Sequence, residues 1–212
     1  MVKPAPGAVQ TSDGPVFRPV TTENWSDFVA VFEGRGGPRS CWCMIWRNGR
    51  DGKPPGPDRS VRKDAMADLV ERGTPVGILG YVAGVPVAWC SIAPRVSYAN
   101  GLAAARAGDA DLNLWSLVCF FVAAPYRKTG LFGALLAEAE AEALRRGAEV
   151  LEAYPVAPDS PSYRFSGFLP NFEAAGFVWI GREGIRRNVV RKSWLCSRFV
   201  RIGDRMAEKL EM

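Results

Sequence analysis

The stretch LWSLVCFFVAAPYRKTGLFGALLAEAEAEALRRG, residues 114–147, decides the fold. Its first nine residues, 114–122, form the most apolar strand candidate in the chain, which predicts a strand at the centre of a sheet. A proline and the RKTGLFG loop follow, and apolar residues from Leu131 onward recur with helical spacing up to Gly147. The stretch therefore predicts a buried strand, a glycine-rich turn and an amphipathic helix in direct succession.

The turn between this strand and this helix has the features of an anion-binding site. Gly130 and Gly133 allow the backbone to approach a bound group closely, and the first-turn amides of the helix lack internal partners. The helix dipole is positive there and Arg127 and Lys128 add charge, so a pyrophosphate suits the site. Neither a P-loop motif nor G-x-G-x-x-G follows the strand, which argues against a P-loop nucleotidase or a Rossmann dehydrogenase. The alternative is that the glycines only make a tight turn.

Elements on either side of this stretch complete one domain. A strand over 150–156 follows the helix, and this strand, helix and strand order predicts a right-handed parallel crossover. Upstream, two apolar runs within 76–94 flank Ala83-Gly84, which predicts an antiparallel hairpin. The other expected elements are a strand over 16–20, a helix capped by Thr22 and ended by Gly34, a loop over 48–58, a helix capped by Ser60 and ended by Gly73, a short helix over 171–175, and strands over 177–182 and 187–194.

The composition excludes several classes of protein. The 212 residues contain no histidine, which removes Ser-His-Asp and Cys-His catalysis and every histidine-bound metal. Five cysteines without a Cys-x-x-Cys pair indicate neither a disulfide scaffold nor a zinc ribbon, so a reducing cytoplasm is expected. No apolar run has the length of a signal peptide or a membrane span. The net charge of +5 favours an anionic partner, but it does not choose between a phosphate-bearing cofactor and nucleic acid.

The strand-to-helix stretch resembles motif A of the GNAT (general N-acetyltransferase) superfamily. In that motif a strand ends in Val, an Arg follows five positions later, and a [QR]-x-x-G-x-[GA] loop binds the pyrophosphate of acetyl-CoA. Val122, Arg127 and Gly130 stand at these positions, and Tyr126 precedes the Arg, where an aromatic residue is common. The sequence departs from the motif at Phe132, because the last glycine comes one residue late.

The resemblance extends over about residues 16–194. The segments 77–94, 171–182 and 187–194 look like the family's second and third strands, its last helix-to-strand step and its final strand. This implies an α/β fold of the α+β kind, with a mixed, mainly antiparallel sheet flanked by helices and splayed at the strand pair that binds the cofactor. The expected organisation is a flexible tail over 1–15, an acetyltransferase domain over 16–194 and a helical extension over 195–212.

The resemblance also implies how acetyl-CoA, the expected co-substrate, is held. In the family, pantetheine amides pair with the backbone of the strand before the loop, and a backbone N–H faces the thioester oxygen. By position, these strand residues are Phe120, Phe121 and Val122. The loop and first helical turn that bind the pyrophosphate are Arg127, Lys128, Thr129, Gly130, Leu131, Phe132 and Gly133. No metal is expected.

Acetyl transfer to an amine also needs a group that accepts a proton. An aliphatic amine has a pKa near 10.4, so only about one molecule in a thousand is neutral at pH 7. Without histidine, the candidate bases are carboxylates or a water relay. Glu152, in the strand after the helix, is the best placed, and Asp109 and Asp111 are the alternatives.

The general acid is less clear from the sequence. Many family members have a Tyr four residues before the glycine of the last helix, and that position is Phe172 here. Tyr154 and Tyr163 are the remaining candidates, although both also fit structural positions. Because a thiol with a pKa near 8.5 leaves reasonably well as thiolate, the reaction can proceed without a strong acid.

Aromatic and thiol side chains each carry two interpretations. Trp42 and Trp46, between the first two helices, are expected either to wall the acceptor cleft or to cover the sheet. Cys119 in the central strand suggests an acyl-cysteine, but no histidine can activate it, so buried packing is the better interpretation. The same holds for Cys41 and Cys43, which would need two further ligands to bind a metal.

Four hypotheses about function follow. The first is transfer of acetyl from acetyl-CoA to a primary amine of a small molecule or peptide, by direct attack in a ternary complex. The second transfers another acyl group, and the third is a degenerate CoA-binding sensor. The fourth is a nucleic-acid module built on Arg182, Arg186, Arg187, Arg191, Lys192, Arg198 and Arg201. The first hypothesis expects no nucleic-acid or membrane partner, while the apolar Leu195, Phe199 and Val200 suit a homodimer.

Overall fold

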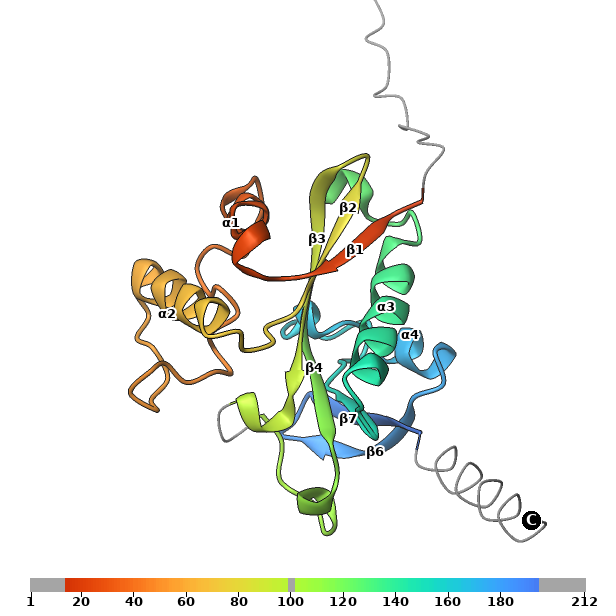
Figure 1. The fold of residues 1–212 in the computed structure, drawn as a ribbon. Helices are drawn as coiled ribbons and strands as arrows, with labels where there is room; N and C mark the ends of the chain where they lie inside the picture. Colours follow the sequence, from red (N-terminus) through yellow and green to blue (C-terminus); the bar gives the residue numbers. More distant parts are fainter. Residues whose placement is uncertain (1–13, 99–101, 195–212) are drawn as a thin grey trace, which may run out of the picture.

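The computed structural model describes residues 14–98 and 102–194, and its sheet lies between two groups of helices (Figure 1). The strands are β1 (Val16–Pro19), β2 (Ile78–Val82), β3 (Val85–Pro94), β4 (Leu114–Val122), β5 (Val150–Ala153), β6 (Val178–Glu183) and β7 (Arg187–Ser193). The α-helices are α1 (Trp25–Glu33), α2 (Arg59–Glu71), α3 (Leu131–Arg145) and α4 (Leu169–Ala174). Short 3-10 helices are η1 (Thr22–Asn24), η2 (Arg95–Ser97), η3 (Asp109–Asp111), η4 (Ala124–Tyr126) and η5 (Arg164–Ser166). The predicted helical extension over 195–212 and most of the predicted tail over 1–15 lie outside the described residues.

The seven strands form one sheet in the order β1-β2-β3-β4-β5-β7-β6. Only the β4–β5 pair is parallel, and α3 makes the crossover between these two strands. Ala83 and Gly84 both have a left-handed φ in the turn between β2 and β3, as a tight hairpin requires. The predicted mixed, mainly antiparallel sheet flanked by helices is confirmed.

The parallel pair is short, and the sheet opens beyond it. Four residues of β4 pair with β5, from Leu114 opposite Val150 to Leu117 opposite Ala153, while β4 continues to Val122. The sequence predicted that β5 extends to Val156, but the strand ends at Ala153, two residues before Pro155, which has no N–H to donate. Val156 instead donates its N–H to the carbonyl of Gly167 at 3.0 Å. The predicted splay is therefore present along the last five residues of β4.

A β-bulge in β4 lies where the splay begins. Cys119 pairs with Ser91 of β3 and Leu117 pairs with Ile92, so Val118 between them has no opposite residue. The bulge changes which face each side chain occupies: Leu117 and Phe120 pack against the cluster beneath α3, while Val118 and Cys119 belong to clusters on the other face. The open part of β4 is thereby rotated relative to the part that pairs with β5.

Each face of the sheet has its own helices. Leu135, Leu136 and Ala139 of α3 and Phe172 of α4 pack in the cluster on one face. Phe28 and Phe32 of α1 and Met66 and Leu69 of α2 pack in the cluster on the other. Figure 1 shows α3 and α4 on one side of the central strands and α1 and α2 on the opposite side. Among the described helices, none is long and apolar enough to cross a membrane.

Three helix starts differ from the prediction. Thr22 does not cap α1: it is the first residue of η1, whose N-cap is Thr21, and α1 begins at Trp25 with Asn24 as its N-cap. Asp58 rather than Ser60 caps α2, because its carboxylate accepts hydrogen bonds from the backbone N–H groups of Ser60 at 2.7 Å and Val61 at 3.4 Å. The short helix expected at 171–175 begins at Leu169, with Pro170 in its first turn, where the missing N–H costs nothing.

Candidate active site

The N-terminus of α3 is open to an external anion. Gly130 is its N-cap, with a left-handed φ of 86°, and the first helical bond runs from Ala134 N–H to the Gly130 carbonyl at 3.2 Å. The amides of Leu131, Phe132 and Gly133 have no acceptor among the described residues. The first turn contains no acidic residue, so nothing on the helix repels a negative ligand there.

The two glycines of this loop are not required by the packing of the protein. A Cβ built on Gly130 or Gly133 would meet no atom within 4 Å. Gly133 also lacks a positive φ, so its backbone conformation suits any residue. Close approach by a bound group accounts for a glycine at 133 where packing and conformation do not. The geometry thus fits a pyrophosphate held by the first turn of α3.

The basic side chains of the loop are exposed beside this turn. Arg127 donates from Nε to the carbonyl of Val122 at 2.8 Å, which ties the loop to the end of β4. Thr129 donates its hydroxyl to the Tyr126 carbonyl at 2.8 Å and so closes the turn. Lys128 has a left-handed φ of 64° and is exposed, so its ammonium is available to an anion.

Phe132, which departs from the family motif, lies away from the loop opening. Its ring packs 4.8 Å from the ring of Phe120 and 6.3 Å from that of Phe172. Leu131 is likewise buried in the cluster beneath α3. These two side chains therefore anchor the helix, and only their backbone amides face the anion site. This site, formed by the amides of Leu131, Phe132 and Gly133 with Lys128 beside them, is called the cradle below.

The open edge of β4 offers backbone groups to an extended ligand. Ala123 donates to the Val87 carbonyl of β3 at 2.9 Å, and Phe121 lies opposite Trp89 of β3. Backbone groups alternate between the two edges of a strand, so those of Phe121 face β3, and those of Phe120 and Val122 face the edge that β5 has left. Of the three strand residues predicted to contact pantetheine, Phe120 and Val122 present backbone groups at this open edge, and Phe121 does not.

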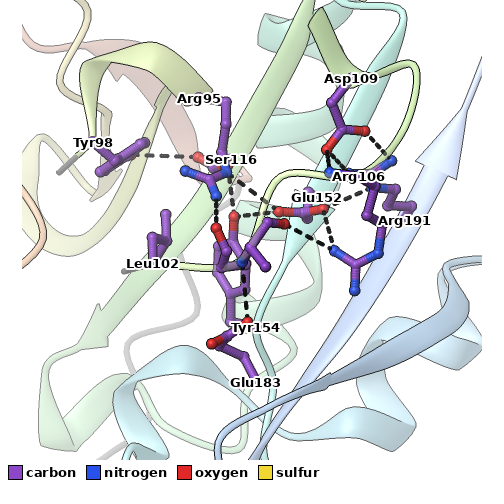
Figure 2. A network of polar contacts seen from close by, with 12 residues as sticks. Arg95, Tyr98, Leu102, Arg106, Asp109, Ser116, Glu152, Tyr154, Glu183 and Arg191 are labelled. Atoms are coloured by element: carbon purple, nitrogen blue, oxygen red, sulfur yellow. Dashed lines mark hydrogen bonds and ion pairs between the residues drawn. The ribbon is translucent and has the colours of Figure 1, made fainter. Parts of the chain in front are cut away.

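A buried polar network joins β4, β5 and β7 where β4 and β5 still pair, next to the start of the splay (Figure 2). Glu152, only 1% exposed, accepts a hydrogen bond from the Tyr154 hydroxyl at 2.6 Å and another from Arg191 Nε at 2.7 Å. The Tyr154 hydroxyl is also 2.9 Å from Ser116 Oγ of β4. The structure therefore places two of the predicted catalytic residues, Glu152 and Tyr154, in direct contact.

Further charged groups surround Glu152. Arg95 Nε lies 3.4 Å from Oε1 and Arg106 Nη1 lies 3.9 Å from Oε2. Arg191 also makes a double contact with Asp109, at 2.8 Å to each carboxylate oxygen. Burial and the neighbouring charge of Glu152 raise the pKa of Tyr154 well above its usual value, so the phenol stays protonated at neutral pH.

Asp109 has a titration that can be tested. Partial burial raises the pKa of Asp109, but the hydrogen bonds from Arg191 and from the backbone of Arg106 outweigh it and lower the pKa. A carboxyl with a lowered folded pKa stabilises the fold above about pH 4 and loses this effect as the pH falls. We expect Asp109→Asn to lower Tm by about 3–6 °C at pH 7. The difference from wild type should shrink toward zero in acid, and a pH-independent difference in calorimetric Tm would contradict the assignment.

Sequence reasoning missed most of the partners of Glu152. Arg95, Arg106 and Arg191 come from three separate segments, and only the strand register brings Arg191 opposite Glu152. Asp109, named only as an alternative base, holds Arg191 instead.

A second group of predicted residues meets around Arg187. Its guanidinium lies 4.6 Å from the ring centroid of Trp46 and 5.7 Å from that of Tyr163. Trp46 packs against the cluster that contains Tyr154 and Val118. Tyr163 is 37% exposed, and its hydroxyl makes no hydrogen bond with a described residue. Trp46 and Tyr163 thus both lie against Arg187, and among the described residues no hydrogen bond joins Tyr163 to Glu152.

Trp42 is placed differently from Trp46. It is buried in the cluster under α1 and α2, stacked 5.1 Å from the Phe32 ring. Cys43 and Cys119 are buried in the same cluster. Trp42 therefore covers the sheet, which was the second of its two interpretations, and it does not line the face that carries Tyr154. Within residues 14–98 and 102–194, no group of acidic and thiol side chains is arranged to bind a metal.

Three of the basic residues predicted to bind nucleic acid are engaged by other groups of the protein. Arg191 is paired with Glu152 and Asp109, and Lys192 is paired with Glu140 at 2.6 Å. Arg187 stacks on aromatic rings. Arg198 and Arg201 lie outside the described residues.

A cavity of about 240 Å³ lies between β1, the end of α2 and the last turns of α3, and no residue of the cradle lines it.

Comparison with known proteins identifies the family. The model of the acetyltransferase (GNAT) family matches residues 39–168, which is more than half of the 212-residue chain. The matched segment contains β4, the glycine loop, α3 and the Glu152–Tyr154 pair. The chain therefore belongs to the GNAT family of acetyltransferases, and the predicted resemblance is confirmed.

Several solved structures share the fold. PaiA N-acetyltransferase from Thermoplasma acidophilum, in complex with coenzyme A, is 13% identical with a TM-score of 0.53, covering 86% of this chain and 100% of that one. YncA from Salmonella typhimurium, with acetyl-CoA, is 15% identical with a TM-score of 0.52, covering 85% and 94%. Ribosomal-protein-alanine N-acetyltransferase from Brucella melitensis is 19% identical with a TM-score of 0.51, covering 84% and 99%. A search of curated protein sequences found no match.

Proposed function

We propose that the protein transfers the acetyl group of acetyl-CoA to a primary amine of a small molecule or peptide, by direct attack in a ternary complex. One observation carries the proposal: the free amides at the start of α3 and the open edge of β4 adjoin each other, while Glu152, which pairs with Ser116, and Tyr154, which follows β5, lie where the splay begins. The structures of PaiA with coenzyme A and YncA with acetyl-CoA support this choice of co-substrate. Acetyl-CoA supplies a thioester whose carbonyl carbon is open to attack by nitrogen.

The cradle and the strand edge position the two ends of acetyl-CoA. The amides of Leu131, Phe132 and Gly133 would hold the pyrophosphate, with Lys128 adding charge. The N–H of Phe120 on the open edge would donate to the thioester oxygen and stabilise the negative charge that develops there. These contacts use backbone groups, so they tolerate the apolar side chains of β4.

Glu152 and Tyr154 provide a path for the proton of the amine. An amine that donates to the Tyr154 oxygen can pass a proton along the 2.6 Å hydrogen bond to Glu152 as its nitrogen bonds to the acetyl carbon. The bond between that carbon and sulfur then breaks, and CoA leaves as a thiolate. Arg191 and Asp109 hold the Glu152 carboxylate in place and are positioning residues in this scheme.

Two measurements test the proposal. Calorimetric titration should show binding of acetyl-CoA, and a panel of primary amines should release free CoA thiol in the presence of acetyl-CoA. Binding without release for any amine would favour the CoA-binding sensor. Absence of binding would contradict the proposed function altogether.

Tyr163 is expected to be dispensable for the chemistry. Its ring stacks near Arg187 and its hydroxyl has no partner among the described residues, so Tyr163→Phe removes no described contact. We expect kcat of Tyr163→Phe to stay within about two-fold of wild type, because a thiolate leaves without a strong acid. A loss of about a hundred-fold, the size of effect that a general acid contributes, would restore Tyr163 as the acid.

A further inference from the structure

The polar network around Glu152 contains more positive than negative charge. Four arginines take part in it or border it: Arg47, Arg95, Arg106 and Arg191. The carboxylates here are Glu152, Asp109 and Glu183, the last accepting from the backbone N–H of Ala104 at 3.1 Å. Four guanidiniums against three carboxylates leave one positive charge in excess among the described residues.

Arg47 is the clearest example of this excess of positive charge. It is fully buried, yet it makes no ion pair with a described residue. One of its nitrogens donates to the Val76 carbonyl at 3.1 Å and to the Tyr98 hydroxyl at 3.0 Å, while Nε and Nη1 have no partner. A buried charge without a counter-charge is costly to a fold. The Tyr98 hydroxyl links it onward to the Ser116 carbonyl at 3.3 Å, so this charge adjoins the residues around Tyr154.

Arg106 is the guanidinium that a ligand can reach. Its side chain is 30% exposed, compared with 16% for Arg191. Its Nη1 lies 3.9 Å from Oε2 of Glu152, beyond hydrogen-bond distance, and among the described residues its side chain makes one long hydrogen bond, of 3.4 Å, to the Ala104 carbonyl. Arg191, by contrast, is fully engaged by Glu152 and Asp109. A planar guanidinium with unused N–H groups suits a carboxylate, which it binds through two parallel hydrogen bonds.

We infer that the acceptor is an amino carboxylic acid, whose carboxylate binds Arg106 while its amine meets Tyr154. This inference rests on the proposed function and names the substrate class of that same site. Arg106 Nη1 lies 3.9 Å from Oε2 of Glu152 and the Tyr154 hydroxyl lies 2.6 Å from Oε1, so the two groups are close enough for one small molecule to reach both. The negative charge of the acceptor offsets the positive excess, whereas a neutral or polycationic amine would leave or increase it.

The test compares amines that differ only in a carboxylate. Glycine, β-alanine and glutamate are paired with glycinamide, β-alaninamide and glutamic acid α-amide, and kcat/KM is measured from release of CoA thiol. Wild type is compared with Arg106→Gln and with Arg59→Gln, an exposed arginine at the first position of α2 that serves as the matched control. The intrinsic reactivity of the amine differs within each pair. The quantity to compare between variants is therefore the ratio of kcat/KM for the acid to kcat/KM for its amide.

We expect this ratio to fall by about 10- to 100-fold in Arg106→Gln and to stay unchanged in Arg59→Gln. Calorimetric affinity for acetyl-CoA should be the same in all three proteins, which shows that the variants are folded. An equal ratio in wild type and Arg106→Gln would overturn the inference and leave the proposed function standing. If these six compounds release no CoA while another primary amine does, the inference is overturned and the proposed function stands. If no primary amine releases CoA although acetyl-CoA binds, both are overturned.

Discussion

Gly133→Glu should weaken acetyl-CoA binding by about a hundred-fold or more. The added carboxylate would stand in the open space at the first turn of α3, where no protein atom lies within 4 Å of a Cβ on Gly133. Placing it against a pyrophosphate costs several kcal/mol, and each 1.4 kcal/mol is about ten-fold in Kd. Calorimetric titration of acetyl-CoA measures the effect.

The same substitution should leave the fold intact, which makes the result interpretable. Position 133 has ordinary backbone angles, and a carboxylate in the first turn of a helix is favourable by about 0.3–1 kcal/mol. Tm is therefore expected to stay level or rise slightly. Ala137→Glu, one turn further along α3 and also exposed, is the matched control and should change Kd by less than about three-fold. Equal affinities of Gly133→Glu and wild type would remove the cradle from the cofactor site.

The cradle was predictable because its signal is local. A strand, a turn and the first residues of a helix are adjacent in sequence, so Gly130, Arg127 and the free amides of α3 follow from one short stretch. The same reasoning misjudged positions where a neighbour decides the outcome. Ser60 is a good capping residue, but Asp58 is better placed, and Pro155 shortens β5 by removing a donor.

The proton path was predictable only in part, because it depends on strand register. Glu152 and Tyr154 are two residues apart in the strand predicted over 150–156, so their shared face could be inferred, although β5 itself ends at Ala153. Ser116 and Arg191 reach them through pairing across β4 and β7, and no local pattern sets that register. The bulge at Val118 likewise leaves no clear sequence signal, although it decides which side chains of β4 face the splay.

Tyr154→Phe should lower kcat by about a hundred-fold while leaving the affinity for acetyl-CoA unchanged. The substitution removes the hydroxyl that joins Ser116 to Glu152 and keeps the ring and the ion pairs of Glu152 with Arg191. Positioned proton transfer contributes about 10²- to 10⁴-fold in rate, so a loss near the lower limit is expected when the carboxylate remains nearby. Steady-state rates of CoA release measure it, and wild-type kcat in this variant would refute the proton path.

Two further variants separate proton transfer from stability. Glu152→Gln should lose at least as much kcat, but it also leaves Arg191 with one charged partner fewer in a buried site, so its Tm should fall. Tyr98→Phe removes a buried hydroxyl that contacts Arg47 and Ser91 and does not touch Glu152, so it should lower Tm and keep kcat within about three-fold. If Tyr98→Phe lost as much kcat as Tyr154→Phe, loosening of the network would explain both. The proton path instead predicts that only Tyr154→Phe and Glu152→Gln lose turnover. Their remaining rate should rise as the pH approaches the pKa of the free amine, because more of the amine is then already neutral. Both results together would show that the hydroxyl and the carboxylate carry the proton.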